Sequence, residues 1–320
     1  MFFSFISLAT FVNQLKDYIS KQKGISMKYF NNIQDYEHAT GELPYNMTNN
    51  YMFIAVLQED KFALRGLVAS LLHRDPEEIT DIFILNPIEL GVDIDLKDYI
   101  LDLVLTFSDN NIMNLEMQVR NQGNWVPRSI SYLCREWDRI HKGDDYTSAP
   151  NAYHIGFLDF TLFEDHPEFY ATYRLRNIND GYTYSDKFTL SVVELKHTDL
   201  ATDEDKQYGI DKWARLFKST TWEEVKSLTE NNAFIQSAAR SMFKREVDES
   251  TLRLCSKLEW EIAAEERRNK RLAELEAKAT KQAATITEQA ATITEQAATI
   301  TEQVATIDQL RKEIAALKGQ

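Results

Sequence analysis

The chain has 320 residues, of which 43% are apolar and 27% charged, and its formal net charge is −14. This composition indicates a globular fold, with enough residues for one large core and an appendage. No GxxxxGK[ST], GxGxxG or GxSxG motif occurs among only ten glycines, so the phosphate-loop, dinucleotide-binding and nucleophile-elbow classes have no support.

The first 40 residues are interpreted as an N-terminal extension. The stretch "MFFSFISLATFV" is apolar, but it lacks a basic region before it and a small-residue cleavage site after it, and it is too short to span a bilayer. We expect translation to begin at Met27, or the stretch to form a short docked helix. We expect no membrane association.

Residues 41–246 are predicted to form one domain. Apolar residues at helical spacing predict a helix over 49–72, capped by Asn49 or Asn50. Further along, the pattern predicts a strand over 80–89, a hairpin from strands 99–107 and 112–119, a helix over 128–145 ended by Gly143, and strands over 153–163 and 188–197. This order predicts an α/β fold, with a mixed sheet flanked by helices.

The composition changes after residue 246. Residues 247–282 are rich in Ala, Leu, Glu, Lys and Arg without Gly or Pro, which predicts a long charged helix. Residues 283–320 contain "AATITEQ" three times and predict a coiled coil, hence a homo-oligomer. Its seam is Ile286, Ile293, Ile300, Ile307 and Ile314 with Ala290, Ala297 and Val304, shifting at the end to Leu310 and Leu317. An unstructured low-complexity tail is the alternative.

The two cysteines, Cys134 and Cys255, lie far apart and form no CxxC motif. This pattern favours a reducing, cytoplasmic compartment and indicates neither a disulfide framework nor a zinc ribbon. The six histidines include no HExxH pattern, so zinc catalysis has no support either.

Two acidic residues, Asp102 and Glu116, lie within otherwise apolar runs of the predicted hairpin. Glu116 and Gln118 are two residues apart and therefore share one face of their strand. A two-residue loop would pair Asp102 with Met117 and place the acid on the other face. A loop with an odd residue count, such as 109–111, would pair Asp102 with Gln118 and gather all three polar groups on one face. A functional site requires the odd count.

Two carboxylates in apolar surroundings repel each other, and a divalent cation between them removes that cost. Hard oxygen ligands suit Mg²⁺ or Mn²⁺, which would polarise a phosphate and lower the pKa of a bound water. Gln118 could align the attacking water. The alternative is structural: Asp102 would be a strand-end acid paired with Lys97, while Glu116 and Gln118 would line a solvated face.

Several segments together resemble the Rpn family of recombination-promoting nucleases, bacterial proteins often labelled transposases, within the PD-(D/E)xK superfamily. These are "NNYMFIAVLQEDKFALRGLVASLL", "ILNPIEL", "LKDYILDLVLTFSDNNIMNLEMQV", "RSISYLCREW" and "YSDKFTLSVVELKH". The resemblance implies a restriction-endonuclease-like fold in which Asp102 and Glu116 bind the metal and Gln118 stands where many members have lysine. Relatives tend to have Asn-Asp before "YMF", where this chain has Asn49 and Asn50.

A second set of acidic residues matches the (D/E)xK sequence motif more closely than Glu116 and Gln118 do. Asp186 is followed by Glu194-Leu195-Lys196, and on strand spacing Glu194 and Lys196 share a face. Asp186, however, lies in the turn-like stretch "DGYTYSD". We keep this set as an alternative site.

A basic strip follows the acidic hairpin. Its candidate DNA contacts are Arg120, Arg128, Tyr132, Arg135 and Arg139, the last four at steps of one helical face. Residues 251–320 hold 11 basic and 11 acidic residues, so the whole acidic excess lies in residues 1–250. A domain with this negative charge is not expected to bind DNA non-specifically. Binding of a polyanion would require a local basic strip, a bound metal, or both. The alternative is a surface stripe paired with acids such as Asp138. Trp125 and Trp137 are expected in the core.

These features together predict a Mg²⁺- or Mn²⁺-dependent DNA endonuclease of a transposase or recombination-promoting type. The competing hypothesis is a catalytically weak or inactive nuclease fold that binds DNA or protein and oligomerises through its tail. Cleavage of RNA would use the same residues and is not separated from cleavage of DNA by sequence.

Overall fold

The computed structural model describes residues 36–87, 102–108, 110–138, 143 and 145–318. The chain divides into two compact units, Met1–Glu259 and Trp260–Gln320. The expected start at Met27 and the side chains of Lys97 and Arg139 lie outside the described residues. No described helix is long and apolar enough to cross a membrane.

The helices of the first unit are α2 (Asn50–Glu59), α3 (Lys61–Leu72), α4 (Trp125–Trp137), α5 (Asp203–Tyr208), α6 (Ile210–Lys218), α7 (Trp222–Leu228) and α8 (Ala233–Glu246), and α9 (Glu249–Lys318) begins within it. Short 3₁₀ helices lie at Tyr36–His38, Pro76–Glu78, Tyr146–Ser148 and Thr198–Leu200. The helix predicted over 128–145 begins earlier and ends before Gly143, at Trp137.

The single helix predicted over 49–72 is wrong, because Asp60 divides it into α2 and α3. Asn49 caps α2 by accepting hydrogen bonds from the backbone amides of Tyr51 and Met52. The Asp60 carboxylate then accepts from the amide of Ala63 and starts α3. An aspartate at this position stabilises a new helix start better than it stabilises a helix interior.

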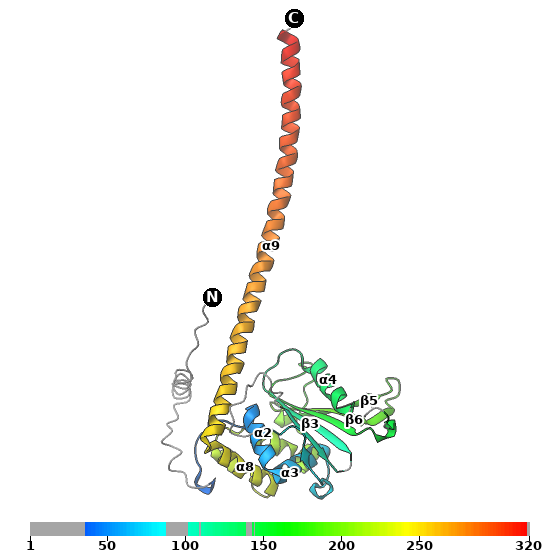
Figure 1. Ribbon diagram of the computed structural model, residues 1–320, viewed down its shortest axis with the longest axis vertical. Helices are drawn as coiled ribbons and strands as arrows, with labels where there is room; N and C mark the ends of the chain where they lie inside the picture. The colour runs from blue at the N-terminus through cyan, green and yellow to red at the C-terminus, as the bar shows by residue number, and fades with distance from the viewer. Residues whose placement is uncertain (1–35, 88–101, 109, 139–142, 144, 319–320) are drawn as a thin grey trace. The chain divides into compact units, whose positions relative to one another are not determined.

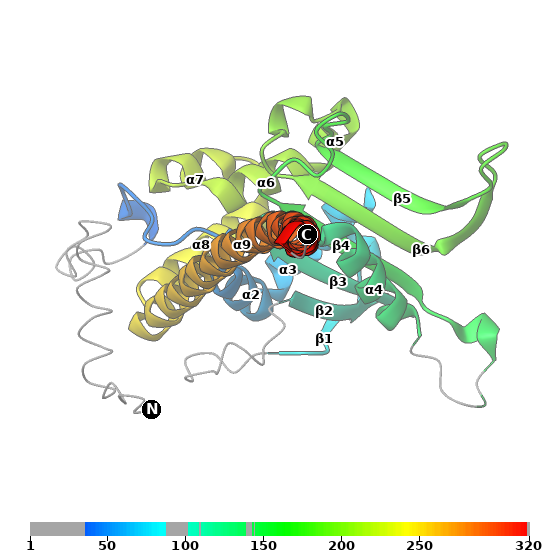
Figure 2. The same ribbon diagram turned by 90° about the horizontal axis from the view of Figure 1, so that it is seen from above.

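The strands are β1 (Phe83–Ile84), β2 (Asp102–Phe107), β3 (Asn111–Gln118), β4 (Asn151–Leu158), β5 (Tyr170–Arg176) and β6 (Thr183–Glu194), in the sheet order β1-β2-β3-β4-β6-β5. Strands β3, β4 and β6 are parallel, whereas β2 and β5 run antiparallel to their neighbours. Figures 1 and 2 show this mixed sheet with helices around it, so the predicted fold class is confirmed. The antiparallel strand β5 was not predicted from the sequence, and β1 is shorter than expected.

The two faces of the sheet bury different residues. On one face, Phe157 of β4 packs against Phe53 of α2 and Phe217 of α6, with ring centroids 5.6 and 5.1 Å apart. On the other face, Leu133 of α4 packs with Val104 of β2 in one apolar cluster. The side chains of Asp102, Glu116 and Gln118 fall on the α4 face, because residues two apart on a strand point the same way. Helix α4 therefore covers the predicted site.

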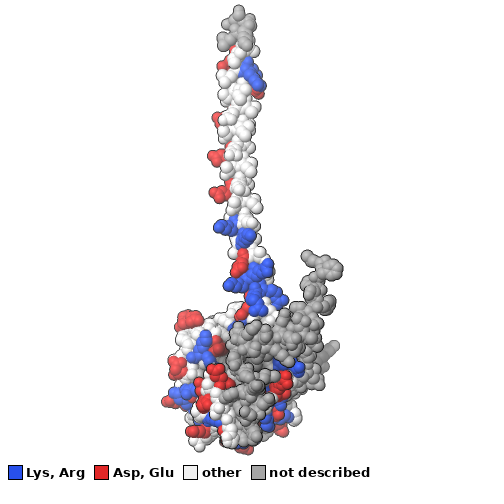
Figure 3. All heavy atoms as spheres, turned by 90° about the vertical axis from the view of Figure 1, so that its left-hand side faces the viewer, with Lys and Arg blue, Asp and Glu red and all other residues white. Residues whose placement is uncertain are grey.

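The second unit is the helical tail, residues 260–318 of α9, which confirms the predicted long helix. Its heptad stripe is exposed, with 65% of Ile293 and 59% of Ile300 accessible to solvent. Much of the helix surface is uncharged in Figure 3, and residues 283–304 contain no Lys or Arg. The continuous helix does not support the unstructured alternative.

Candidate metal and catalytic site

Asp102 and Glu116 lie directly opposite each other on the antiparallel strands β2 and β3. Facing pairs of this kind have Cβ atoms about 5 Å apart, so both carboxyl groups project from one face of the sheet. The loop is Ser108–Asn110, with the odd count that a site requires. The expected pairing of Asp102 with Gln118 is wrong, because the observed partner, Glu116, lies two residues earlier on β3. Asn111 already belongs to β3, and Asn110 turns the chain with a left-handed φ of 64°.

Both acids are buried, and burial raises their pKa values. Only 7% of Asp102 and 1% of Glu116 is exposed. Desolvation raises the pKa of Asp102 to about 6, opposed by a hydrogen bond from Asn114 and reinforced by Glu136. It raises the pKa of Glu116 to about 7, because the cost of burial exceeds the attraction of the nearby Arg128 guanidinium. The pair therefore lacks enough positive charge to hold two ionised carboxylates near neutral pH.

Arg128 of α4 reaches inward to both motif residues on β3. One of its terminal nitrogens pairs with Glu116 Oε1, and Nη1 donates to Gln118 Oε1 at 3.1 Å. The Gln118 amide nitrogen in turn donates to the backbone oxygen of Arg120 at 2.7 Å. Both ends of the Gln118 amide are thus engaged. The side chain of Arg128 is 30% exposed and that of Glu116 is 2% exposed, so Arg128 lies on the solvent side of the buried acid.

Aromatic and imidazole groups line the inner side of the site. His154 on β4 is fully buried, and its Nε2 lies 3.7 Å from Glu116 Oε2. Burial and the positive charge of Arg128 lower the pKa of His154 to about 3, so its ring is neutral. The ring of Tyr132 meets His154 edge-on, with centroids 5.8 Å apart. The guanidinium carbons of Arg128 and Arg135 lie 5.5 and 5.4 Å from the Tyr132 ring centroid.

The donor set at the acid pair fits a small divalent cation. Glu116 Oε2 is a buried oxygen without a hydrogen-bond partner in the described part of the chain. Among the described residues, no three His, Cys, Asp or Glu side chains gather as a metal cluster. Two carboxylates, with water and substrate phosphate completing the shell, are the arrangement that Mg²⁺ commonly uses. Asp102 and Glu116 would hold the ion.

The alternative site does not assemble. Asp186 and Glu194 lie on the same strand, β6, eight residues apart, which separates their Cα atoms by about 26 Å. Asp186 is exposed and lies within β6, not in the turn that its sequence predicts. The Glu194 carboxylate accepts a hydrogen bond from the amide of Leu162 and lies 3.5 Å from His197. Because Asp186 does not reach Glu194, the predicted set does not form one site.

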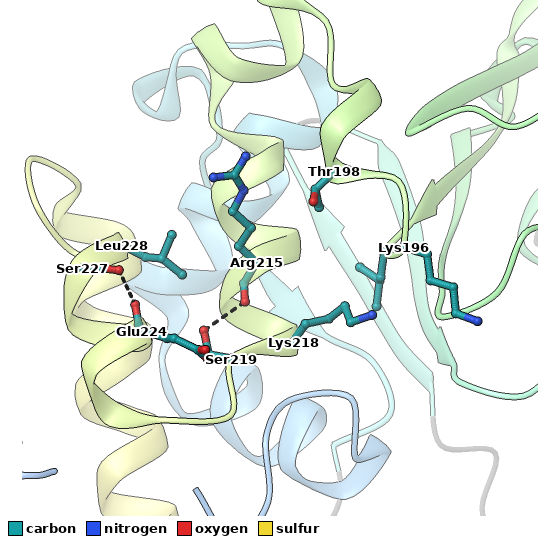
Figure 4. Close-up of a pocket in the computed structure, with 9 residues that line it drawn as sticks. Lys196, Thr198, Arg215, Lys218, Ser219, Glu224, Ser227 and Leu228 are labelled. Carbon is teal, nitrogen blue, oxygen red and sulfur yellow. Dashed lines mark hydrogen bonds between the residues drawn. The ribbon is translucent and has the colours of Figure 1, made fainter. Parts of the chain in front are cut away.

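Lys196 instead lines a separate pocket of about 430 Å³ beside α6 and α7 (Figure 4). The lining also includes Arg215, Lys218 and Glu224. Two of the three cations already have carboxylate partners: Lys218 pairs with Asp159 at 2.7 Å, and Arg215 lies 3.8 Å from Asp211. In Figure 4 the amines of Lys196 and Lys218 extend away from the Arg215 guanidinium. The cations do not converge on one point, so the pocket is not assigned a ligand.

The structure divides the predicted basic strip. Arg128 is directed at the acids, Arg135 is exposed beside Tyr132, and Arg120 is exposed just after β3. Trp125 is buried as expected, and Trp137 packs at the edge of an apolar cluster.

Sequence reasoning missed Asn114, Glu136 and His154. The alternation of Asn114, Glu116 and Gln118 along β3 could have indicated the first, because all three share one face. No local pattern indicates the other two, which come from α4 and β4.

Comparison with known proteins gives one match. Residues 48–271 match the model of the family described as PD-(D/E)XK nuclease family transposase. No curated protein and no solved structure matches the chain. The matched region includes α2 to α8 and the whole sheet, with both facing acids, and covers more than half of the chain. The chain therefore belongs to the PD-(D/E)XK nuclease family of transposases.

Proposed function

We propose that the protein is a Mg²⁺- or Mn²⁺-dependent DNA endonuclease that hydrolyses phosphodiester bonds during transposition or recombination. The observation that carries the proposal is the direct pairing of Asp102 with Glu116 on one face of the sheet. Both acids are buried with raised pKa values, a state that a bound cation would relieve. Family membership supports the nuclease class.

In hydrolysis, a water oxygen bonds to phosphorus while one phosphorus–ester oxygen bond breaks, and a proton is transferred from the water to the leaving oxygen. A bound Mg²⁺ would supply Lewis acidity and lower the pKa of the attacking water. Asp102 and Glu116 would hold the ion at the edge of the buried site. Leu133 and Trp125 of α4 pack on the same face of the sheet, and the burial of both acids strengthens electrostatic interactions there.

The cationic side chains of α4 are the proposed path for the DNA backbone. Arg128, Arg135 and the ring of Tyr132 form one stack on the helix face next to the acids. Guanidinium groups suit phosphate oxygens, and an aromatic ring can pack on a base or sugar. Because the domain is acidic overall, we propose binding that is selective and weakens steeply with salt.

Nicking of supercoiled plasmid in Mg²⁺ or Mn²⁺ tests the proposal. We expect activity in the wild type, and its loss in Asp102→Asn and in Glu116→Gln, which keep size while removing charge. Glu194→Gln is the matched control, since it changes a similarly buried acid at the end of β6, which β4 separates from β3. Equal nicking by wild type and both site variants would refute the proposal. Loss in Glu194→Gln alone would move the site to the alternative set.

A second function is favoured by one contact. Arg128 pairs with Glu116 and so occupies one oxygen that a metal would use. This arrangement also suits a catalytically weak nuclease fold that binds DNA or protein and assembles through the heptads of α9. Calorimetric titration with Mn²⁺ separates the two functions. A wild type without a Mn²⁺ site that still binds DNA would be a binding module, whereas a site lost in Glu116→Gln supports the endonuclease.

A further inference from the structure

Among the described residues, the cation that pairs with Glu116 is Arg128, which belongs to α4 and not to β3. The family description (D/E)XK places a lysine two residues after the second acid, and in this chain that position, after Glu116, holds the uncharged Gln118. An amide can donate and accept hydrogen bonds but supplies no positive charge. The contacts of Gln118 indicate a different use for its side chain.

Gln118 holds Arg128 in place. Its Oε1 accepts the hydrogen bond from Arg128 Nη1, while its own Nε2 is fixed to the carbonyl of Arg120. With both ends engaged, the amide has one defined orientation, in which the oxygen faces the guanidinium. The same guanidinium also contacts the ring of Tyr132, with its carbon 5.5 Å from the ring centroid. Three contacts from two elements thus fix the Arg128 side chain beside Glu116.

We propose that Arg128 supplies the positive charge next to the acid pair by contacting the phosphate that is cleaved, and that Gln118 is its positioning residue. This inference rests on the proposed endonuclease function. Arg128 has five N–H donors, and two of them are used in contacts with Glu116 and Gln118 in the described part of the chain. The remaining donors belong to a side chain that is 30% exposed, on the solvent side of a buried acid. A phosphate approaching the acids from solvent would meet this guanidinium.

The alternative is that Arg128 serves only as a structural counter-ion for Glu116. The two roles predict different kinetics. A counter-ion supports folding and the charge of the acid, so its loss lowers stability but leaves the cleavage rate at saturating metal unchanged. A phosphate contact made in the transition state lowers kcat when it is removed and leaves metal binding intact.

The first experiment compares Arg128→Gln and Arg128→Lys with wild type in single-turnover nicking. We expect Arg128→Gln to lower the cleavage rate about 100-fold or more, the usual effect of losing one charged donor at a developing charge. Arg128→Lys should retain more activity, because it keeps the charge. Mn²⁺ affinity by calorimetry should be unchanged or higher in Arg128→Gln, since one competitor for Glu116 is gone. Lower stability with an unchanged cleavage rate at saturating metal would overturn the inference in favour of the counter-ion.

The second experiment moves the positive charge from Arg128 on α4 to position 118 on β3. In the double variant Gln118→Lys/Arg128→Gln, we expect at least a tenfold recovery of the cleavage rate over Arg128→Gln alone. Gln118→Met, which has similar length without an amide, should slow cleavage in wild type but add little to Arg128→Gln, because the two residues act as one unit. Additive losses without recovery would mean that Gln118 does not act through Arg128.

A third measurement separates this inference from the proposed function. DNA affinity is measured against salt concentration without metal, and Arg128→Gln should reduce the salt slope by about one phosphate contact. If the wild type does not nick but the slope changes, the endonuclease proposal fails and the phosphate contact stands. If the wild type nicks and neither rate nor slope changes in Arg128→Gln, the inference fails and the endonuclease proposal stands. Absence of both effects overturns both.

Discussion

The indole of Trp125 occupies the space where a side chain at Gly156 would begin. A Cβ atom built on Gly156 would lie 2.0 Å from Trp125 Cζ2, far inside contact distance. Gly156 is paired with Glu116 on the neighbouring strand, and Trp125 is the first residue of α4. The absence of a side chain on β4 therefore lets α4 approach the sheet closely enough for Arg128 to reach Glu116.

Gly156→Ala should lift the start of α4 from the sheet. Overpacking of this kind costs about 1–3 kcal/mol, and we expect the loss of stability to be accompanied by slower nicking and a changed Mn²⁺ affinity. The control is Gly66→Ala, where a new Cβ would lie 2.3 Å from Phe234 at the contact between α3 and α8. It should lower the melting temperature without changing Mn²⁺ affinity. Equal effects of both variants on Mn²⁺ affinity would contradict the role of Gly156.

The contribution of Asp102 and Glu116 to stability should fall as pH rises from about 4 to 7 in the absence of metal. Buried His154, whose pKa is lowered from 6.5 to about 3, contributes with the opposite sign below pH 6.5. The folded-state pKa values of Asp102 and Glu116, about 6 and about 7, lie above the ordinary values of 3.8 and 4.5. At these two acids the folded protein therefore holds more protons than the unfolded chain in this range, and each proton lost on raising the pH removes stability. Melting temperatures across this pH range, compared with those of Asp102→Asn/Glu116→Gln, measure the effect. The difference in melting temperature between wild type and variant isolates the two acids from His154, and it should change in favour of the variant as the pH rises.

Divalent cations should restore that stability above pH 7. Binding to the folded state alone raises the free energy of unfolding in proportion to the logarithm of cation concentration. We expect Mn²⁺ to raise the melting temperature more at pH 8 than at pH 5, because protons compete for the same carboxylates. A rise of equal size in Glu116→Gln would place the ion elsewhere.

We expect the chain to form oligomers through the apolar heptad stripe of α9. Ile293 and Ile300 repeat seven residues apart and are more than half exposed, which is costly for a lone helix in water. Ile293→Gln/Ile300→Gln, or deletion of residues 283–320, should lower the solution mass measured by light scattering. Thr292→Gln/Thr299→Gln, at neighbouring positions outside the stripe, should leave the mass unchanged. A wild type that is already monomeric would refute this prediction.

Asp60 should contribute more to the free energy of unfolding than an exposed loop aspartate does. One carboxylate oxygen caps α3 through the amide of Ala63, and the other accepts hydrogen bonds from Ser237 and Ser241 of α8 at 2.6 and 2.8 Å. Asp60→Ala should lower the free energy of unfolding by about 2–3 kcal/mol, as loss of a cap and two further hydrogen bonds to a charged group would. Denaturant unfolding measures this, with exposed Asp75→Ala, which caps only a short 3₁₀ turn, as the comparison.

Local sequence was sufficient for the elements with strong periodicity. Two apolar runs separated by a turn-forming stretch predicted β2 and β3, and the seven-residue repeat predicted a long helix over the tail, because these patterns depend on residues near one another in the chain. It was also sufficient to single out Asp102 and Glu116, since acids inside apolar runs are conspicuous. Strand β5 lies at the edge of the sheet and is exposed over residues 172–176, so its place in the sheet depends on pairing with β6, which no local pattern reports.

The chain by itself thus determined the two acids, the need for an odd hairpin loop, and the helical tail. Only the tertiary structure decided that Asp102 faces Glu116, since the register depends on where the turn falls within three residues. Only packing decided that Gly156 admits Trp125 and that Arg128 lies against the acids, because these contacts join α4 to strands that are adjacent only after folding. The periodicity of a sequence predicts which face of a helix or strand a residue lies on. Which residues contact each other on that face depends on tertiary packing.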